Sequence, residues 1–456
     1  MQKVLWTAFL MALLPSGFAQ LSPAITSWLQ NTTETGSYYI QGNSTAIDNG
    51  ILYNCQKVEY SADFVYVTTN GIPAYPTGPF LDGNPSQATS QNAIFKLPLA
   101  PLENTGTPIS TFGGNIGLFI NGVALFDFRD GVGWDPTTNE LCGGPGNPRC
   151  PGGPMAASDW NRDAIVAERA GFDCSKAHPA MGNYHHHQNP SAFKLDLTVL
   201  SNICDLYDAD GLYAIDSTKH SPLIGFAYDG FPIYGAYGYR NEDGTGGVTR
   251  IKSGYQLRAI TQRNTHADGS NVDQGPDVGT AYPLGYFRED YEWIAHPGDE
   301  DFLDVHNGRF CVTPEYPGGT YAYFATVDEN WNSSYPYAVG PTFYGMAESR
   351  DVASVVEPTT VYQATTSISE KDFQGLNISI FPNPASDLIA IQIHDLIQED
   401  FDIELVDMAG RVVKSAKIEK GSTIAYFDTQ ATYAGTYLVK VASHGLSYTK
   451  KIVIQK

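Results

Sequence analysis

The sequence predicts a mainly β protein, with a large β-rich domain followed by a small immunoglobulin-like β-sandwich. The first observation is composition: the chain has 45 glycines, 28 prolines and 28 tyrosines, and only 17% of its residues are charged. This mixture favours turn-rich β structure over helices. The second is a series of short β-branched or alternating segments separated by turn dipeptides. The third is a break after residue 350, where aromatic residues give way to threonine, serine and valine.

The domain boundaries follow these changes in composition, and a chain of 456 residues is long enough for two or three domains. We predict a signal peptide over 1–19, a large domain with a few short helices over 20–350, a linker over 351–374 and a small domain over 375–456. The first segment has a basic start at Lys3, an apolar run and small residues before Gln20, which is typical of a secretory signal. The apolar run is too short to cross a bilayer. We therefore expect a secreted or surface-held protein without a membrane span.

The clearest hairpin of the large domain lies at residues 116–126. Two apolar β segments flank the dipeptide Asn121-Gly122, which favours a two-residue hairpin turn. Residues 191–200 alternate between apolar and polar side chains and predict another strand.

Residues 158–170 predict the best helix of this domain. Ser158 would be its N-cap, and Glu168 would lie on its largely solvent-exposed side. The helix leads directly into a histidine-rich stretch, so we expect it to pack behind that stretch.

Four of the ten histidines lie close together in the sequence: His178, His185, His186 and His187. In an extended segment, successive side chains point to opposite faces. His185 and His187 then share one face, roughly 6.6 Å apart along the strand, while His186 shares the other face with Tyr184. His178 precedes a Pro-Ala-Met-Gly turn that can fold it back toward His185.

This pattern predicts a metal site with His178, His185 and His187 as ligands. Imidazoles bind a metal ion at roughly 2.0–2.1 Å, and they favour a divalent transition metal, here Zn or Cu. Three protein ligands would leave a position for water or substrate and allow hydrolysis or redox chemistry, with His178 as a ligand or a general base. Asp173 or Asp304 would orient a ligand from behind. The alternative is that the histidines are structural and held by hydrogen bonds.

Further candidates for the surroundings of the site come from polar and aromatic positions in predicted strands and turns. Asp304 and His306 are two residues apart before a turn and can share a strand face; an ordinary surface strand end is the alternative. The other pocket candidates are Tyr184, His186, Tyr228, Asp229 and Tyr234. For the tyrosines, packing within a β-sheet is the alternative.

The cysteines number six, and an even number in an exported chain predicts up to three disulfides. Spacing alone leaves 15 pairings open. We expect Cys142–Cys150 across a Gly/Pro-rich loop, Cys174–Cys204 around the histidine stretch, and Cys55–Cys311 between the ends of the large domain. A thiolate metal site is the alternative, although the chain contains no Cys-x-x-Cys pair.

Calcium is a second candidate cofactor. The segment Asp205–Gly211 carries three acidic residues and a glycine, as calcium-binding loops do. Placing Gly211 at the invariant glycine of such a loop leaves Leu206 at the first ligand position and Ser217 at the closing glutamate position. We therefore expect a polar turn with at most weak Ca²⁺ binding.

The formal net charge of −22 argues against nucleic acid as a partner, because phosphate binding relies on basic groups. No P-loop, His-Glu-x-x-His or Gly-x-Ser-x-Gly motif is present. The histidine stretch is therefore the main candidate for chemistry.

The string Gly-Asn-Tyr-His-His-His at Gly182–His187 resembles the signature of the YHYH-domain proteins, with His186 where the family name has tyrosine. Residues 224–235, 307–310, 313–317 and 335–337 are also similar to that family. A second Tyr-His-Tyr element expected near 320–324 has Ala322 in place of histidine, which weakens the case for a ligand from that strand. The resemblance implies a fold unit over roughly residues 20–350 and a set of candidate residues, but no reaction.

The small domain resembles the C-terminal sorting domain of type IX secretion. The similarity lies in Phe381-Pro382-Asn383-Pro384, Asp407-Met408-Ala409-Gly410-Arg411, Ala434-Gly435-Thr436-Tyr437 and Lys450-Lys451-Ile452-Val453. It implies export through the periplasm and outer membrane by the type IX machinery, to the cell surface or the medium. The alternative is an ordinary immunoglobulin-like module that binds a ligand.

Two functions remain open from the sequence. The first is a metal-dependent hydrolase or oxidoreductase centred on the histidines. The second is a non-catalytic extracellular module that binds glycans or proteins through its tyrosines and uses the histidines structurally. In both cases the ligand, whether small molecule, glycan or protein, is unknown.

Overall fold

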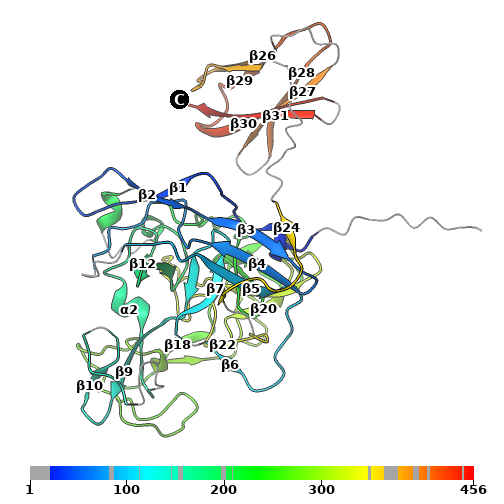
Figure 1. The fold of residues 1–456 in the computed structure, drawn as a ribbon. Helices are drawn as coiled ribbons and strands as arrows, with labels where there is room; N and C mark the ends of the chain where they lie inside the picture. Colours follow the sequence, from blue (N-terminus) through cyan, green and yellow to red (C-terminus); the bar gives the residue numbers. More distant parts are fainter. Residues whose placement is uncertain are drawn as a thin grey trace, which may run out of the picture. The chain divides into compact units, whose positions relative to one another are not determined.

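The computed structural model describes residues 21–81, 87–111, 113–144, 146–151, 158–196, 202–207, 209–347, 351–363, 378–393, 400–407, 411–443 and 446–455. The predicted signal peptide lies outside these residues and stays a prediction. Contacts divide the chain into two compact units, Met1–Gln363 and Ala364–Lys456, and each is described by itself (Figure 1).

The first unit is built mainly from short strands, as predicted. Its helical elements are α1 (Pro23–Thr26), α2 (Ala164–Glu168) and the 3₁₀ turns η1 (Phe193–Leu195), η2 (Asn202–Asp205) and η3 (Arg288–Asp290). Its strands are β1 (Thr35–Tyr38), β2 (Ile47–Leu52), β3 (Cys55–Tyr60), β4 (Phe64–Thr69), β5 (Ala93–Pro98), β6 (Ile109–Ser110), β7 (Asn115–Phe119), β8 (Ala124–Phe126), β9 (Arg129–Asp135), β10 (Glu140–Cys142), β11 (Asn161–Asp163), β12 (Ala177–Ala180), β13 (Asn183–His186), β14 (Leu223–Ala227), β15 (Pro232–Tyr234), β16 (Tyr237–Tyr239), β17 (Val248–Arg250), β18 (Tyr255–Leu257), β19 (Tyr291–Trp293), β20 (Gly308–Cys311), β21 (Thr320–Phe324), β22 (Thr342–Phe343), β23 (Asp351–Val352) and β24 (Thr360–Tyr362).

The largest sheet of this unit carries the histidine stretch. Its strand order is β12-β13-β8-β7-β14-β15-β21-β20, and β13 pairs in parallel with β8. The sheet β23-β5-β4-β3-β24 lies against the same hydrophobic core, to which Phe95 contributes from β5 and Phe226 from β14. The burial of apolar side chains in this shared core stabilises both sheets.

The hairpin predicted at residues 116–126 is confirmed as β7 and β8, with Leu118 opposite Ala124. Its turn needs glycine at Gly122, where φ is +77° and an added Cβ would lie 2.3 Å from Thr69 Oγ1. The turn residues in the sequence were thus sufficient to place this element.

The helix predicted over 158–170 is wrong in its start and its length. Residues 161–163 instead pair with β9, and the helix α2 begins only at Ala164. The N-cap is Asp163, whose Oδ1 accepts a hydrogen bond from the Ile165 amide at 2.8 Å, and not Ser158. A carboxylate that satisfies the free amides of the first turn sets the helix start here.

The strand predicted over 191–200 is also wrong where the chain is described. Residues 193–195 form the 3₁₀ turn η1, closed by a hydrogen bond from the Asp196 amide to the Phe193 carbonyl at 2.9 Å. Phe193 is buried while Lys194 reaches outward to pair with Asp210 at 2.7 Å. The remaining positions, 197–200, lie outside the described residues.

The predicted linker over 351–374 also changes with the structure. Residues 351–363, which we predicted as linker, contribute β23 and β24 to the sheet of β3, β4 and β5. The rest of the predicted linker lies outside the described residues.

One predicted disulfide, Cys142–Cys150, is present. The pairings Cys174–Cys204 and Cys55–Cys311 are not formed, and all four of these cysteines are free. Cys174 Sγ lies 3.7 Å from the carbonyl of Tyr207, and Cys55 Sγ lies 3.6 Å from that of Ile120. Cys174 and Cys204 nevertheless lie side by side as thiols, and a hydrogen bond with Cys204 raises the pKa of Cys174.

The second unit forms a β-sandwich, as predicted. Its strands are β25 (Ile378–Phe381), β26 (Leu388–Ile393), β27 (Phe401–Asp407), β28 (Val412–Ile418), β29 (Ile424–Asp428), β30 (Gly435–Ser443) and β31 (Leu446–Ile454). They make two sheets, β25-β26-β29 and β28-β27-β30-β31. Alternate side chains such as Ile391, Ile403 and Val439 point into one shared core. Residues 408–410 of the resemblance lie outside the described chain.

Candidate metal centre

The three predicted ligands are brought together by the β12–β13 hairpin. The two strands pair antiparallel, with His178 directly opposite His185. Met181 and Gly182 form the turn, with φ values of +49° and +86°, which suits a tight two-residue hairpin. The turn therefore folds His178 back onto the face that carries His185, as the sequence predicted.

The imidazoles of His178, His185 and His187 converge in a buried position. One ring nitrogen from each lies within 4.8 Å of the others, and the Nε2 atoms of His185 and His187 are 3.0 Å apart. The three residues are 6%, 1% and 4% exposed. Burial removes competing water from the nitrogens, which makes the cluster unlike a solvated histidine run.

Backbone hydrogen bonds fix which nitrogen carries the proton in two of these rings. His185 Nδ1 lies 2.8 Å from the Asn183 carbonyl, and His187 Nδ1 lies 2.6 Å from the Asp127 carbonyl. A carbonyl oxygen only accepts, so both Nδ1 atoms must donate. In the neutral rings both Nε2 atoms therefore carry lone pairs, and these face one another. That arrangement is favourable when a cation or a proton lies between them.

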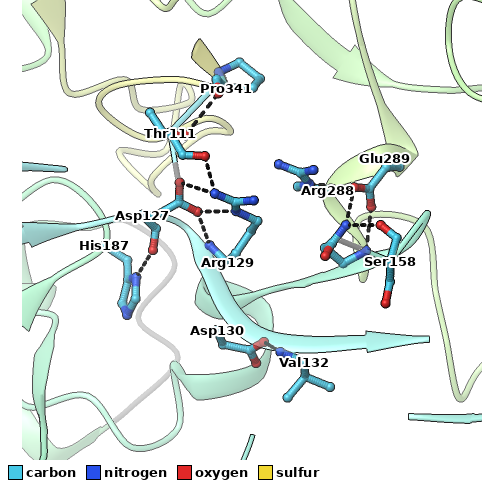
Figure 2. Close-up of polar contacts among 11 residues, drawn as sticks. Thr111, Asp127, Arg129, Asp130, Val132, Ser158, His187, Arg288, Glu289 and Pro341 are labelled. Atoms are coloured by element: carbon cyan, nitrogen blue, oxygen red, sulfur yellow. Dashed lines mark hydrogen bonds and ion pairs between the residues drawn. The ribbon is translucent and has the colours of Figure 1, made fainter. Parts of the chain in front are cut away.

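The carbonyl that orients His187 is itself held in place (Figure 2). The buried Asp127 carboxylate accepts hydrogen bonds from Arg129 Nε at 2.8 Å and from its Nη2 at 3.2 Å. Arg129 Nη2 also donates to the Thr111 carbonyl. These contacts fix the segment after β8, and thereby the direction of the His187 ring.

Glu168 is the site residue that sequence reasoning missed. We expected it on the solvent side of a helix, but its Oε2 atom lies 3.2 Å from His178 Nε2 and 3.3 Å from His187 Nε2. It is the last residue of α2, which lies beside β12 (Figure 1). Oε2 is buried between these two imidazole nitrogens. The available signal was a carboxylate late in the helix that leads into the histidines.

The charges of the cluster are set by burial and by mutual contact. Burial lowers the pKa of His185 well below its usual value, and the neighbouring imidazoles of His187 and His178 lower it further. Burial alone would raise the pKa of Glu168, but its contacts with His178 and His187 outweigh that effect and lower the pKa. The cluster thus pairs a neutral imidazole at His185 with an ionised carboxylate.

Two aromatic rings wall the cluster. Phe126 stacks on His185 with ring centroids 3.7 Å apart, and Phe172 contacts His178 edge-on at 5.0 Å. Phe172 is also near-parallel to His187 at 6.2 Å. Such an apolar shell restricts ring rotation and water access around the nitrogens.

The opposite face of β13 holds a separate, hydrogen-bonded network. Tyr75 hydroxyl lies 2.8 Å from His186 Nε2, and Tyr184 hydroxyl donates to Asp173 Oδ2 at 2.8 Å. Asp173 also accepts from the Gly78 amide at 2.9 Å. Burial lowers the pKa of His186 to about 3. We predicted Asp173 as an orienter of the ligands, but its contacts are on this other face, and backbone carbonyls do the orienting.

The remaining candidates make their contacts elsewhere in the domain. Asp304 accepts from the Tyr321 hydroxyl at 3.0 Å, and His306 Nδ1 lies 2.6 Å from Thr342 Oγ1. Asp229 accepts from the Tyr323 hydroxyl at 2.6 Å. Tyr234 hydroxyl bonds Thr313 and Glu315 at 2.8 Å each, and Tyr228 packs in the core against Phe95. These residues hold strands together, which was the alternative for the tyrosines.

The predicted calcium segment does not form a metal-type cluster among the residues described. Across the described chain, the group of three or more potential metal ligands is the cluster of His178, His185 and His187. Asp210 is paired with Lys194, and Asp208 lies outside the described residues.

Comparisons with known proteins agree with both resemblances. The family model described as "YHYH protein" matches residues 94–336, and that described as "Secretion system C-terminal sorting domain" matches 379–455. A search of curated proteins finds no match. Among the described residues, no helix has the length and apolar character needed to cross a membrane.

Two solved structures are similar to parts of the chain. One is a DUF3244 family protein with an immunoglobulin-like β-sandwich fold from Bacteroides vulgatus, with 20% identity, a TM-score of 0.15, and coverage of 17% of this chain and 82% of that one. The other is dimeric latent PorU from Porphyromonas gingivalis, with 16% identity, a TM-score of 0.15, and coverage of 25% and 11%.

The sorting domain establishes the destination of the protein. It implies interaction with the type IX secretion machinery and export to the cell surface or the medium. The first match spans more than half of the chain and includes the histidine cluster. The chain therefore belongs to the YHYH protein family and carries a type IX secretion sorting domain at its C-terminal end.

Proposed function

We propose that this exported protein binds a divalent transition metal through His178, His185, His187 and Glu168. The observation that carries the proposal is the convergence of the Nε2 atoms of His185 and His187, 3.0 Å apart, with a buried Glu168 oxygen that lies 3.2 Å from His178 Nε2 and 3.3 Å from His187 Nε2. Such a set of acceptors is costly to bury without a positive charge among them. A bound cation satisfies all of them at once.

The distances support a single ion. Four ligands at roughly 2.0–2.1 Å around a tetrahedral metal lie about 3.3 Å from one another. The closest pairs here are His185–His187 at 3.0 Å, Glu168–His178 at 3.2 Å and Glu168–His187 at 3.3 Å. Small side-chain shifts suffice to complete the geometry.

The donor set favours Zn or Cu over calcium or magnesium. Imidazole nitrogens suit Zn, Cu, Fe and Ni, whereas the hard cations prefer all-oxygen sites. One carboxylate among three neutral imidazoles leaves a net charge of about +1 on a divalent centre.

Hydrolytic or redox chemistry is the activity that this centre would support. Glu168 is the most exposed of the four ligands, with a side chain that is 25% accessible. If a water molecule displaced Glu168 from the metal, the Glu168 carboxylate would lie beside that water and would act as a general base. The histidines would keep the ion in place during that exchange.

The test is to purify the full chain from the secreted fraction and measure bound metals by mass spectrometry. We expect about one equivalent of Zn or Cu, lost in a variant that carries His185→Ala and His187→Ala. His266→Gln, on a separate loop, is the control. Failure of the wild-type protein to bind either metal after dialysis against Zn²⁺ and against Cu²⁺ would overturn the proposal. That result, together with a melting temperature that chelator does not change, would favour the non-catalytic glycan- or protein-binding module.

A further inference from the structure

Two cysteines lie side by side as thiols at the base of the histidine hairpin. Cys174 is in the turn before β12, and Cys204 is in η2. Cys174 is completely buried in a small cluster with Tyr39 and Tyr207, and the half-buried Cys204 packs against that cluster. The two side chains are hydrogen-bonded to each other. Thiols in contact need only a small movement to form a disulfide, whose S–S bond is about 2.0 Å long.

The contacts of the other two free cysteines involve no second thiol among the described residues. The Sγ atom of Cys55 lies 3.6 Å from the Ile120 carbonyl, and Cys311 is hydrogen-bonded to the Arg309 side chain. Both cysteines are fully buried. They therefore provide an internal reference for the behaviour of the pair.

The two members of the pair differ in access to solvent. Cys204 is partly exposed, whereas Cys174 is shielded. The hydrogen bond with Cys204, together with burial, raises the pKa of the Cys174 thiol. A thiolate attacks a disulfide only where that disulfide can reach it. Cys204 is therefore the thiol that reacts first with an external partner, and Cys174 is placed to attack Cys204 afterwards.

A bond between these cysteines would enclose the histidine hairpin in a covalent loop. The strands β12 and β13 and the following His187 all lie between Cys174 and Cys204 in the sequence. The Cys174 carbonyl accepts a hydrogen bond from the Phe193 amide at 2.8 Å, and Cys174 Sγ lies 3.7 Å from the Tyr207 carbonyl. The two ends of this loop are thus already held together without a covalent bond.

We propose that Cys174 and Cys204 are a redox-active pair, oxidised after export to a disulfide that stabilises the loop carrying the histidines. Disulfides persist outside the cell, where the sorting domain directs this protein. The structure contains the reduced form of the pair. The proposal does not depend on whether the histidines bind a metal.

The oxidant is a protein or small molecule that itself carries a disulfide. Cys204 loses its proton and attacks one sulfur of that disulfide, which releases one thiolate and leaves a mixed disulfide on Cys204. Cys174 then loses its proton and attacks the Cys204 sulfur, which releases the second thiolate. The two protons convert the released thiolates to thiols, so that two electrons pass from the cysteine pair to the oxidant.

The test is peptide mapping of the full chain, collected from the secreted fraction without reductant and alkylated before digestion. Trypsin places the two cysteines in separate peptides, residues 170–176 and 195–219. We expect these peptides to be linked through Cys174 and Cys204, with Cys55 and Cys311 recovered as free thiols. Cys204→Ser should lose the linked peptide and leave Cys174 free, whereas the matched control Cys55→Ala should keep the link.

Two further measurements follow the reaction and its effect. In the reduced native protein, iodoacetamide should modify Cys204 at least about 10-fold faster than Cys55 or Cys311, because these two are fully buried. Oxidised glutathione added in its place should restore the linked peptide. The bridged protein should melt about 5 °C above the Cys204→Ser variant, because the bridge constrains the unfolded chain.

Three outcomes would overturn this proposal. The first is a secreted protein with four free thiols that oxidised glutathione does not join. The second is linkage of Cys174 or Cys204 to Cys55 or Cys311 in place of each other. The third is a bridged protein that melts no higher than the Cys204→Ser variant. The mapping uses the unsubstituted chain, so a variant that fails to fold does not affect the first two outcomes.

Discussion

The two faces of the β13 segment carry the same residue type with opposite hydrogen bonding. On one face, His185 and His187 turn their Nδ1 atoms to backbone carbonyls and leave their Nε2 atoms facing each other at 3.0 Å. On the other, His186 uses Nε2 for the Tyr75 hydroxyl at 2.8 Å. Both faces are buried.

This difference separates a ligand-type histidine from a packing histidine without reference to burial or spacing. A packing histidine has its Nε2 paired with a protein group. A ligand-type histidine has its Nδ1 paired with a carbonyl and its Nε2 aimed at other acceptors. The following experiments test that distinction, beginning with the largest expected effect.

Replacing both His185 and His187 by alanine should lower metal affinity more than 100-fold, because two of four proposed ligands are removed. The measurement is competition for Zn²⁺ with a chromogenic chelator. His186→Phe is the comparison on the opposite face and should bind Zn²⁺ within about threefold of the wild type. Equal losses in the two variants would show that the faces do not differ as argued.

Glu168→Gln should weaken metal binding by about 10–100-fold while the fold is kept. Glutamine has the same shape but lacks the charge that compensates the cation. The same competition assay measures the effect, and Glu140→Gln, an exposed acid in β10, serves as the control. An unchanged affinity would remove Glu168 from the ligand set.

His186→Phe should destabilise the first unit by about 1 kcal/mol, because the buried Tyr75 hydroxyl loses one hydrogen-bond partner and keeps Asn121 and Tyr184. Every tryptophan of the chain lies before residue 364, so denaturation followed by tryptophan fluorescence reports on this unit. Double replacement of His186 by Phe and Tyr75 by Phe should recover part of the loss. No loss in the single variant would mean that the hydrogen bond contributes nothing.

Asp163→Asn should remove roughly 3 kcal/mol of the change in unfolding free energy between pH 5 and pH 8. Burial raises the pKa of Asp163 to about 7, from an ordinary value of 3.8. Between these values the unfolded chain is ionised and the folded one stays protonated, so this group costs stability as pH rises from about 4 to about 7. Asparagine still caps α2 but does not titrate. The free energy of unfolding of the variant, relative to the wild type, should therefore be higher at pH 8 than at pH 5. An equal difference at both pH values would refute the pKa assignment.

The sequence was sufficient for features that depend on neighbouring residues. Strand alternation separated His185 and His187 from His186, and the Met181-Gly182 turn returned His178 to the same face. It was insufficient where contact is made through space. Glu168 was misplaced because the helix starts at the Asp163 cap, and a polar residue in a predicted long helix is assigned to solvent by default. The Asp127 carbonyl could not be foreseen, because every residue has one.

The register of the β12–β13 hairpin also bears on the order in which the protein folds. Its three histidines lie within ten residues of sequence, whereas the Asp127 carbonyl is 60 residues from His187. Local contacts form before distant ones because their loops close at lower entropic cost. If the site holds a metal ion as proposed, the hairpin alone would bind it as a loose chelate early in folding. Docking of the distant Asp127 segment would then fix the rings and slow release of the ion, so that the affinity of the site would grow as the domain closes around it.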